Sequence, residues 1–158
     1  MIRFAVNQSV GKKPGQSFWR RALAEIEIVA GRELKTQLKR QGIALKNSEI
    51  SLALVGDAAM RRLNRIYRGK DQVTDVLSFG AHDQAKNFRF CGPEYLGEII
   101  IAYPQARRQA KIAKHSLDSE LSLLLTHGFL HLLGLDHEKS KKDAQLMEKL
   151  QAKIVKSK

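Results

Sequence analysis

Residues 126–138 read THGFLHLLGLDHE, and three of the five histidines of the chain lie in this stretch, at His127, His131 and His137. The surrounding leucines predict a buried helix that ends at Gly134, where the chain can adopt the left-handed conformation that glycine tolerates best. His127 and His131 are four residues apart, so both rings project from one helix face, about 6 Å apart at the backbone. The turn at Gly134 can bring His137 back toward the same point. Three neutral imidazoles with an open fourth position are the composition of a catalytic zinc site, and zinc suits three imidazoles best.

Two plainer interpretations compete with a catalytic metal. The histidines could be unrelated core residues, but burying several imidazoles together carries a desolvation cost with no obvious return. They could instead hold a purely structural zinc. Such a site usually has four protein ligands, and the single cysteine, Cys91, has no Cys-x-x-Cys partner to complete one.

The spacing of the three histidines is also that of the metzincin proteases, whose motif is H-E-x-x-H-x-x-G-x-x-H. In this chain Gly128 stands at the position of the glutamate. That glutamate is the base that deprotonates the zinc-bound water during peptide cleavage. The sequence therefore argues against ordinary metalloprotease chemistry. Met147 lies in a predicted helix, and we interpret it as a core residue rather than as a Met-turn.

Outward from this stretch, the apolar periodicity predicts an α+β fold. Short β-prone runs predict strands over residues 2–6, 50–55, 76–79 and 96–103. Apolar residues at spacings of three and four predict helices over residues 17–40, 57–68, 104–115, 119–133 and 141–155. We expect Asp57 to cap the second helix and Ser116 or Asp118 to cap the fourth. The prediction is a small mixed sheet of about four strands covered by about five or six helices, with the metal site on a late helix and the following turn.

The composition predicts a globular protein of one domain, residues 1–158, because a chain of 158 residues can still build a single core. No apolar run approaches the roughly 20 residues of a membrane span, and the first residues lack the long apolar stretch of a secretion signal. A single cysteine excludes an internal disulfide and fits a reducing compartment. We therefore expect a cytoplasmic protein that does not act at a membrane.

The formal charge of the chain is +12, and it is unevenly distributed. Residues 1–70 hold 15 basic and 5 acidic side chains, residues 71–138 hold 6 and 9, and residues 139–158 hold 7 and 2. A basic first half and a basic tail favour a polyanionic partner, most often a nucleic acid. A soluble surface without such a partner is the alternative interpretation.

The stretch around the histidines resembles the signature of the YbeY family, the endoribonucleases of ribosomal RNA maturation, which is approximately H-G-x-x-H-L-x-G-Y-D-H. Only Leu135 departs from it, where an aromatic residue is common. Residues 63–79, LNRIYRGKDQVTDVLSF, are similar to the family's L-N-x-x-Y-R-x-x-D-x-P-T-D-V-L-S-F, with Val73 in place of a proline. Residues 96–101 resemble its G-D-I-x-I strand, with Glu98 in place of aspartate.

The resemblance implies a metal-dependent endoribonuclease that acts on single-stranded RNA in 16S rRNA 3′-end maturation and ribosome quality control. It implies one Zn²⁺ ion on His127, His131 and His137, and a positively charged cavity beside the metal with Arg68 reaching into it. The partners it implies are rRNA and the small ribosomal subunit with its assembly factors, and no DNA is expected.

Arg68 is the best candidate for a catalytic residue that does not bind the metal, because a guanidinium can hold two phosphate oxygens at once. The nucleophile could be a water molecule that zinc activates, or the RNA 2′-OH, and the sequence does not choose between them. We interpret Asp75 and Ser78 as turn residues with local capping bonds. Asp136 could orient a ligand or simply form the turn.

Two other functions remain open at this point. The chain could be a ribosome assembly factor that binds rRNA or a ribosomal protein and whose zinc is mainly structural. It could also hydrolyse another substrate, peptides included, although Gly128 argues against that.

Overall fold

The computed structural model describes residues 1–11, 14–81, 95–137 and 140–156. Its strands are β1 (Arg3–Gln8), β2 (Glu49–Val55), β3 (Val76–Gly80) and β4 (Tyr95–Ala102). Its helices are α1 (Gln16–Glu33), α2 (Lys35–Gln41), α3 (Asp57–Arg68), α4 (Tyr103–Ile112), α5 (Leu117–Leu132) and α6 (Lys141–Lys156), with a short 3₁₀ turn, η1 (Leu45–Asn47). No helix in the described part of the chain is long and apolar enough to cross a membrane.

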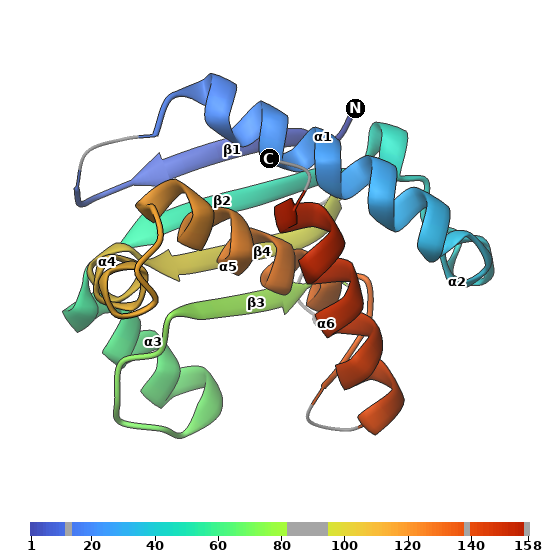
Figure 1. Ribbon diagram of the computed structural model, residues 1–158. Helices are drawn as coiled ribbons and strands as arrows, with labels where there is room; N and C mark the ends of the chain where they lie inside the picture. The colour runs from blue at the N-terminus through green and yellow to red at the C-terminus, as the bar shows by residue number, and fades with distance from the viewer. Residues whose placement is uncertain (12–13, 82–94, 138–139, 157–158) are drawn as a thin grey trace.

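The four strands form one mixed sheet in the order β1-β2-β4-β3 (Figure 1). β1 and β4 both run parallel to β2, and β3 runs antiparallel to β4 at the edge. The expected α+β architecture is therefore confirmed, and the structure adds the strand order that the sequence could not provide.

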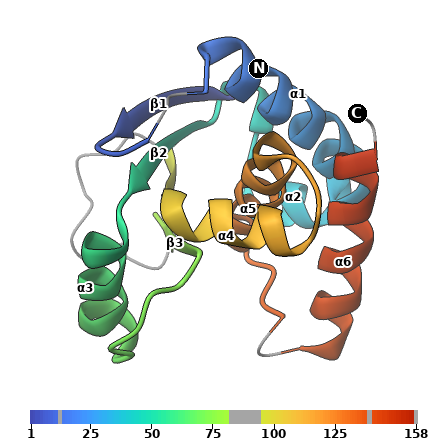
Figure 2. The ribbon, with the colours of Figure 1, turned by 60° about the vertical axis from the view of Figure 1, so that its left-hand side comes forward.

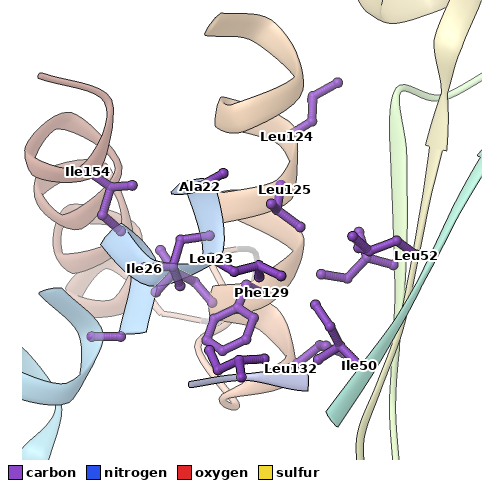
Figure 3. Close-up of a cluster of buried hydrophobic side chains, with 14 of the residues drawn as sticks. Ala22, Leu23, Ile26, Ile50, Leu52, Leu124, Leu125, Phe129, Leu132 and Ile154 are labelled. Carbon is purple, nitrogen blue, oxygen red and sulfur yellow. The ribbon is translucent and has the colours of Figure 1, made fainter. Parts of the chain in front are cut away.

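The main core lies on one face of the sheet, where α1, α5 and α6 pack together (Figure 3). β2 alternates as predicted, with Ile50, Leu52 and Leu54 buried beneath these helices. Phe129 of α5 is fully buried in the same cluster. Burying a side chain of this kind contributes about 1.5–3 kcal/mol, so these apolar contacts help to hold α5 against the sheet.

A smaller core lies on the other face, under α3, which Figure 2 shows set apart from α1, α5 and α6. Met60 of α3 packs there against Leu77 of β3 and Ile100 of β4. The sheet is thus covered on both faces, and its β3 edge lies near both α3 and α5.

The predicted helix over residues 17–40 is two helices. Leu34 leaves helical geometry, with φ −106° and ψ 14°, and α2 starts immediately after it. Leu34 and Leu38 are both buried, so packing of the shorter helix against the core favours the bend over a continuous helix. α2 ends as expected at Gly42, which is left-handed.

Capping differs from the prediction at one helix and follows it at another. Gly56 is the N-cap of α3 and Asp57 is already its first helical residue, with no side-chain capping bond. The Oγ atom of Ser116 caps α5 by accepting a hydrogen bond from the Ser119 N–H at 3.1 Å. His82, Cys91 and most of the polar stretch 80–94 lie outside the described residues.

Candidate metal centre

Helix α5 positions two of the three histidines. It runs through the middle of the main core and is buried over most of its surface. His127 and His131 lie on the half-buried side of α5, one helical turn apart. Since Phe129 and Leu130 between them are fully buried, the helix cannot rotate without disrupting the core, and this fixes the direction of both rings.

The turn after α5 brings the third histidine to the other two. The Gly134 N–H donates to the His131 carbonyl and the Leu135 N–H to the Leu130 carbonyl, which closes the helix in a Schellman-type turn. Gly134 has φ +82°, a conformation that L side chains rarely adopt. Leu135 is buried at this turn, so the aliphatic residue fills the apolar position where the family signature has an aromatic one. His137 follows two residues later.

The three imidazoles form a compact group. The Nε2 atoms of His127 and His131 lie 3.2 Å apart, and one nitrogen from each of His127, His131 and His137 lies within 4.8 Å of the others. The ring centroids are 4.8–5.0 Å apart. His137 is exposed, whereas the other two rings are half-buried. The cluster therefore has one side turned to solvent.

The electrostatics of the cluster favour neutral rings. Burial, together with the neighbouring His127 and His137 rings, lowers the pKa of His131 to about 4. Burial also lowers the pKa of His127, and His137 acts in the same direction. Both rings are therefore neutral at pH 7 and offer a lone pair, which is the form that binds a metal.

This donor set fits zinc. Zinc–nitrogen bonds are about 2.0–2.1 Å long, so nitrogens around one ion lie roughly 3–4 Å apart, close to the separations seen here. Three histidines in the described residues supply the nitrogens, and the side turned to solvent leaves room for a further ligand. This arrangement resembles the three-ligand catalytic type more than the closed four-ligand structural type.

A cavity of about 360 Å³ opens beside the histidines. The α3–β3 segment and the edge strand β3 form one wall, and the three histidines with Asp136 form the other. Besides these four, the lining residues are Asn64, Arg68, Lys70, Gln72, Thr74, Asp75, Val76, Leu77 and Ser78. Arg68 is thus at the cavity, as predicted, and Lys70 adds a second positive charge. Among the charges near His131, that of Arg68 lowers its pKa.

Asp75 has the local bonds of a turn residue and also lines the cavity. Its Oδ1 accepts from the Val76 N–H at 2.8 Å and from the Thr74 hydroxyl at 3.3 Å. Its Oδ2 accepts from the Gln109 side-chain amide at 2.9 Å. Bonds to both oxygens hold this carboxylate in place. Ser78 also lines the cavity, so the interpretation of Asp75 and Ser78 as turn residues alone was incomplete. Asp136 lines the cavity as well, and both of its expected roles stay open.

Gly128 lies where α5 approaches the sheet most closely. A β-carbon built there would be 2.8 Å from Cγ2 of Ile99 on β4. This position therefore faces the sheet and not the cavity, so the glycine found in place of the metzincin glutamate has a packing reason. The glycine lets the helix that carries His127 and His131 lie close against β4.

Sequence reasoning missed several residues that support the site. The side-chain amides of Gln37 and Gln41 on α2 donate to the Leu133 carbonyl, at 3.0 and 3.4 Å. These bonds cap α5 beside the turn. Gln37 and Gln41 precede Leu133 by 96 and 92 positions in the chain, and no sequence signal links residues so far apart. The Asp143 carboxylate at the start of α6 accepts from the Asp136 N–H at 3.3 Å.

His115 and Glu120 form a pair outside the histidine cluster. His115 Nε2 lies 3.0 Å from the Glu120 carboxylate, and Glu120 is 4% exposed. Burial raises the pKa of Glu120, and Asp75 raises it further, whereas His115 opposes the rise. The i, i+5 spacing across the start of α5 is the only sequence signal for this pair.

Comparison with known proteins matches these features to one family. The family model described as Endoribonuclease YbeY matches residues 19–158. Endoribonuclease YbeY of Myxococcus xanthus is 43% identical over 135 residues, which are 85% of this chain but only 43% of that protein. Endoribonuclease YbeY of Moorella thermoacetica is 45% identical over 118 residues, 72% of this chain and 75% of that protein.

A solved structure shows the same fold. The solution structure of TM1509 from Thermotoga maritima is similar with a TM-score of 0.58 at 25% sequence identity, covering 98% of this chain and 87% of that one. The motif resemblance, the sequence matches and the shared fold agree, and the chain belongs to the YbeY endoribonuclease family.

Proposed function

We propose that this chain is a zinc-dependent endoribonuclease that cleaves single-stranded RNA in the maturation of the 16S rRNA 3′ end and in ribosome quality control. One observation carries the proposal: three imidazoles meet at a cavity that also holds Arg68 and Lys70. Membership in a family whose relatives are named endoribonucleases supports it. The proposed partners are rRNA and the small ribosomal subunit with its assembly factors, and the proposed location is the cytoplasm, where residues 1–158 act as one domain.

The proposed zinc ligands are His127, His131 and His137. When bound, zinc supplies a Lewis acid that activates water or polarises a phosphoryl oxygen. The protein contributes neutral rings, since burial lowers the pKa values of His127 and His131. It also contributes rigidity, because α5 is anchored in the core and its end is capped from α2.

Arg68 is the proposed catalytic residue for phosphate charge. Its guanidinium can donate to two oxygens of the scissile phosphate and stabilise the charge that develops there. Lys70 lies on the same wall and adds to the positive potential. The attacking group is either water or the RNA 2′-OH. A 2′,3′-cyclic phosphate among rapidly quenched products would identify the 2′-OH, and its absence would identify water.

The test is cleavage of a structured 16S rRNA 3′ fragment by the wild type and by His131→Ala, purified identically, with the zinc content of both measured. We expect cleavage by the zinc-loaded wild type and none by the zinc-poor variant. Equal cleavage by both would assign the activity to a contaminant and refute the metal site as its source.

If neither protein cuts although the wild type holds zinc, the same pair is to be tested on isolated small ribosomal subunits. Cleavage there by the wild type alone supports a ribosome-dependent enzyme. Equal binding of both to the subunit without cleavage would support the alternative, an assembly factor with a mainly structural zinc.

A further inference from the structure

A second cavity of about 520 Å³ lies between α5 and α6 and borders the histidine cluster from the other side. Its lining includes His127 and His137, which also line the cavity that holds Arg68. α6 lies alongside α5 at this place (Figure 1). The two cavities are therefore neighbours that meet at the candidate metal centre.

The second cavity differs in chemistry from the first. Its walls are apolar, formed by Leu123 of α5 and by Ala144, Met147 and Ala152 of α6. Two polar side chains of α6, Glu148 and Gln151, complete the lining. An apolar space with a few hydrogen-bonding groups suits a nucleobase, whose faces are apolar and whose edges carry donors and acceptors.

The polar pair at this groove can distinguish base edges. A carboxylate such as Glu148 only accepts hydrogen bonds, and so favours an exocyclic amine. The amide of Gln151 both donates and accepts. Gln151 and His127 both line this groove, so the groove adjoins the candidate metal centre.

Position and charge favour RNA as the occupant over an apolar protein side chain. In RNA the base is attached one sugar away from each phosphate, so a phosphate held at the histidines places a base within reach of the adjoining groove. α6 itself is basic, with the exposed Lys141 and Lys142 at its start. Positive charge beside an apolar groove complements a nucleotide, which is anionic at one end and aromatic at the other.

We propose that the groove between α5 and α6 is a subsite for the base of a nucleotide that flanks the scissile phosphate, with Leu123, Ala144 and Ala152 contacting the base. The subsite rests on the proposed ribonuclease function and deepens it, because it gives the cleavage site a base requirement. It also explains a preference for single strands, since a base can enter the groove only when it is unpaired.

The test uses a short fluorescent single-stranded RNA and a set of base-deleted versions of it. In each version, one nucleotide carries a hydrogen atom in place of its base. Binding to the zinc-loaded protein is measured by fluorescence anisotropy on ice, with a gel to verify that the RNA stays intact. Cleavage of the same RNAs is then measured at the working temperature. The blocking variant is Ala152→Trp, at an exposed position of α6. The matched control is Ala113→Trp, which adds the same ring at an exposed alanine that lines neither cavity.

We expect the wild type to bind the RNA roughly 5-fold or more weakly when one particular base is removed, which is the effect of losing one stacked base. Removal of a base far from that position should change the affinity little. Ala152→Trp should weaken binding of the intact RNA and no longer discriminate at that position, whereas Ala113→Trp should behave as the wild type. Circular dichroism and zinc content verify that both variants fold.

The proposal fails if every base-deleted RNA binds the wild type as the intact RNA does, and this measurement needs no variant. It also fails if Ala152→Trp still discriminates, which would indicate another occupant such as a protein side chain. If the wild type shows the expected binding pattern but cleaves none of these RNAs, the subsite stands, and the enzymatic function is decided by the test on small ribosomal subunits described above. The two failures are therefore distinguishable.

Discussion

Replacing Gly128 by alanine should destabilise the protein, although alanine is the better helix former. In a helix interior the change from glycine to alanine alone stabilises by about 1 kcal/mol. In this fold the new β-carbon would lie 2.8 Å from Cγ2, 3.3 Å from Cγ1 and 3.4 Å from Cδ1 of Ile99. Ile99 is fully buried and β-branched, so it cannot turn away easily. Overpacking of this kind costs about 1–3 kcal/mol, which leaves a net destabilisation of about 1 kcal/mol.

The sign of this effect should reverse when the contact is removed. Ile99→Ala deletes all three contacting atoms, so in that background Gly128→Ala should stabilise by about 1 kcal/mol through helix propensity alone. The coupling free energy between the two positions is then about 2 kcal/mol, within the range for residues in contact. Ile99→Val is the matched control, because it retains Cγ1 and Cγ2 and so should keep Gly128→Ala destabilising.

The assay is urea unfolding monitored by circular dichroism, with zinc present. It compares Gly128 with Gly128→Ala in three backgrounds, which are the wild type, Ile99→Ala and Ile99→Val. A drop of about 1 kcal/mol lowers the melting temperature by roughly 2–4 °C in a domain of this size. If Gly128→Ala stabilises the wild type as much as it stabilises Ile99→Ala, then the close approach of α5 to β4 is not the reason for glycine here.

Four further outcomes are expected. Arg68→Glu should retain zinc but lose most RNA cleavage or binding, and unchanged activity would remove this residue from the site. Ser116→Ala should lower the free energy of unfolding by about 1 kcal/mol in urea, because it removes the cap of α5, and an unchanged midpoint would contradict this. Burial raises the pKa of Glu98 in the folded state, so the folded state favours the protonated carboxyl. The free energy of unfolding is therefore highest below the ordinary glutamate pKa and falls as the pH rises through the raised value. Glu98→Gln should therefore be more stable than the wild type at pH 7 and similar at pH 3 in urea titrations, and a constant difference across this range would speak against it. Zinc at 100 times its Kd should stabilise the folded chain by about 2.7 kcal/mol, seen as a higher melting temperature that a chelator reverses, provided that His131 is intact.

The residues of the candidate site were predictable because they are close in sequence. His127, His131 and His137 need only one helix face and one glycine turn to meet, and both are local features of the chain. The alternation in β2 is local as well and was predicted correctly, and Ser116 was one of the two residues predicted to cap α5. The Asp57 cap was wrong because Gly56 provides the N-cap conformation of α3 without a side-chain bond.

The features that the sequence did not reveal depend on contacts between distant segments. The break at Leu34 follows from packing against the core, which overrides a continuous helical periodicity. The strand order depends on crossovers that leave no local signal. The packing role of Gly128 required the position of Ile99, and the groove between α5 and α6 required the position of a helix that follows the site in the chain.

The bonds from Gln37 and Gln41 to the end of α5 bear on how the protein emerges from its own ribosome. Synthesis proceeds from the N-terminus, so both amides are in place before residues 127–137 leave the exit tunnel. The Leu133 carbonyl can be capped as soon as α5 docks, and only the bond from Asp143 to Asp136 waits for the next few residues. The histidine turn therefore has its capping partners on α2 as soon as α5 docks, and the bonds to the Leu133 carbonyl do not depend on the last helix.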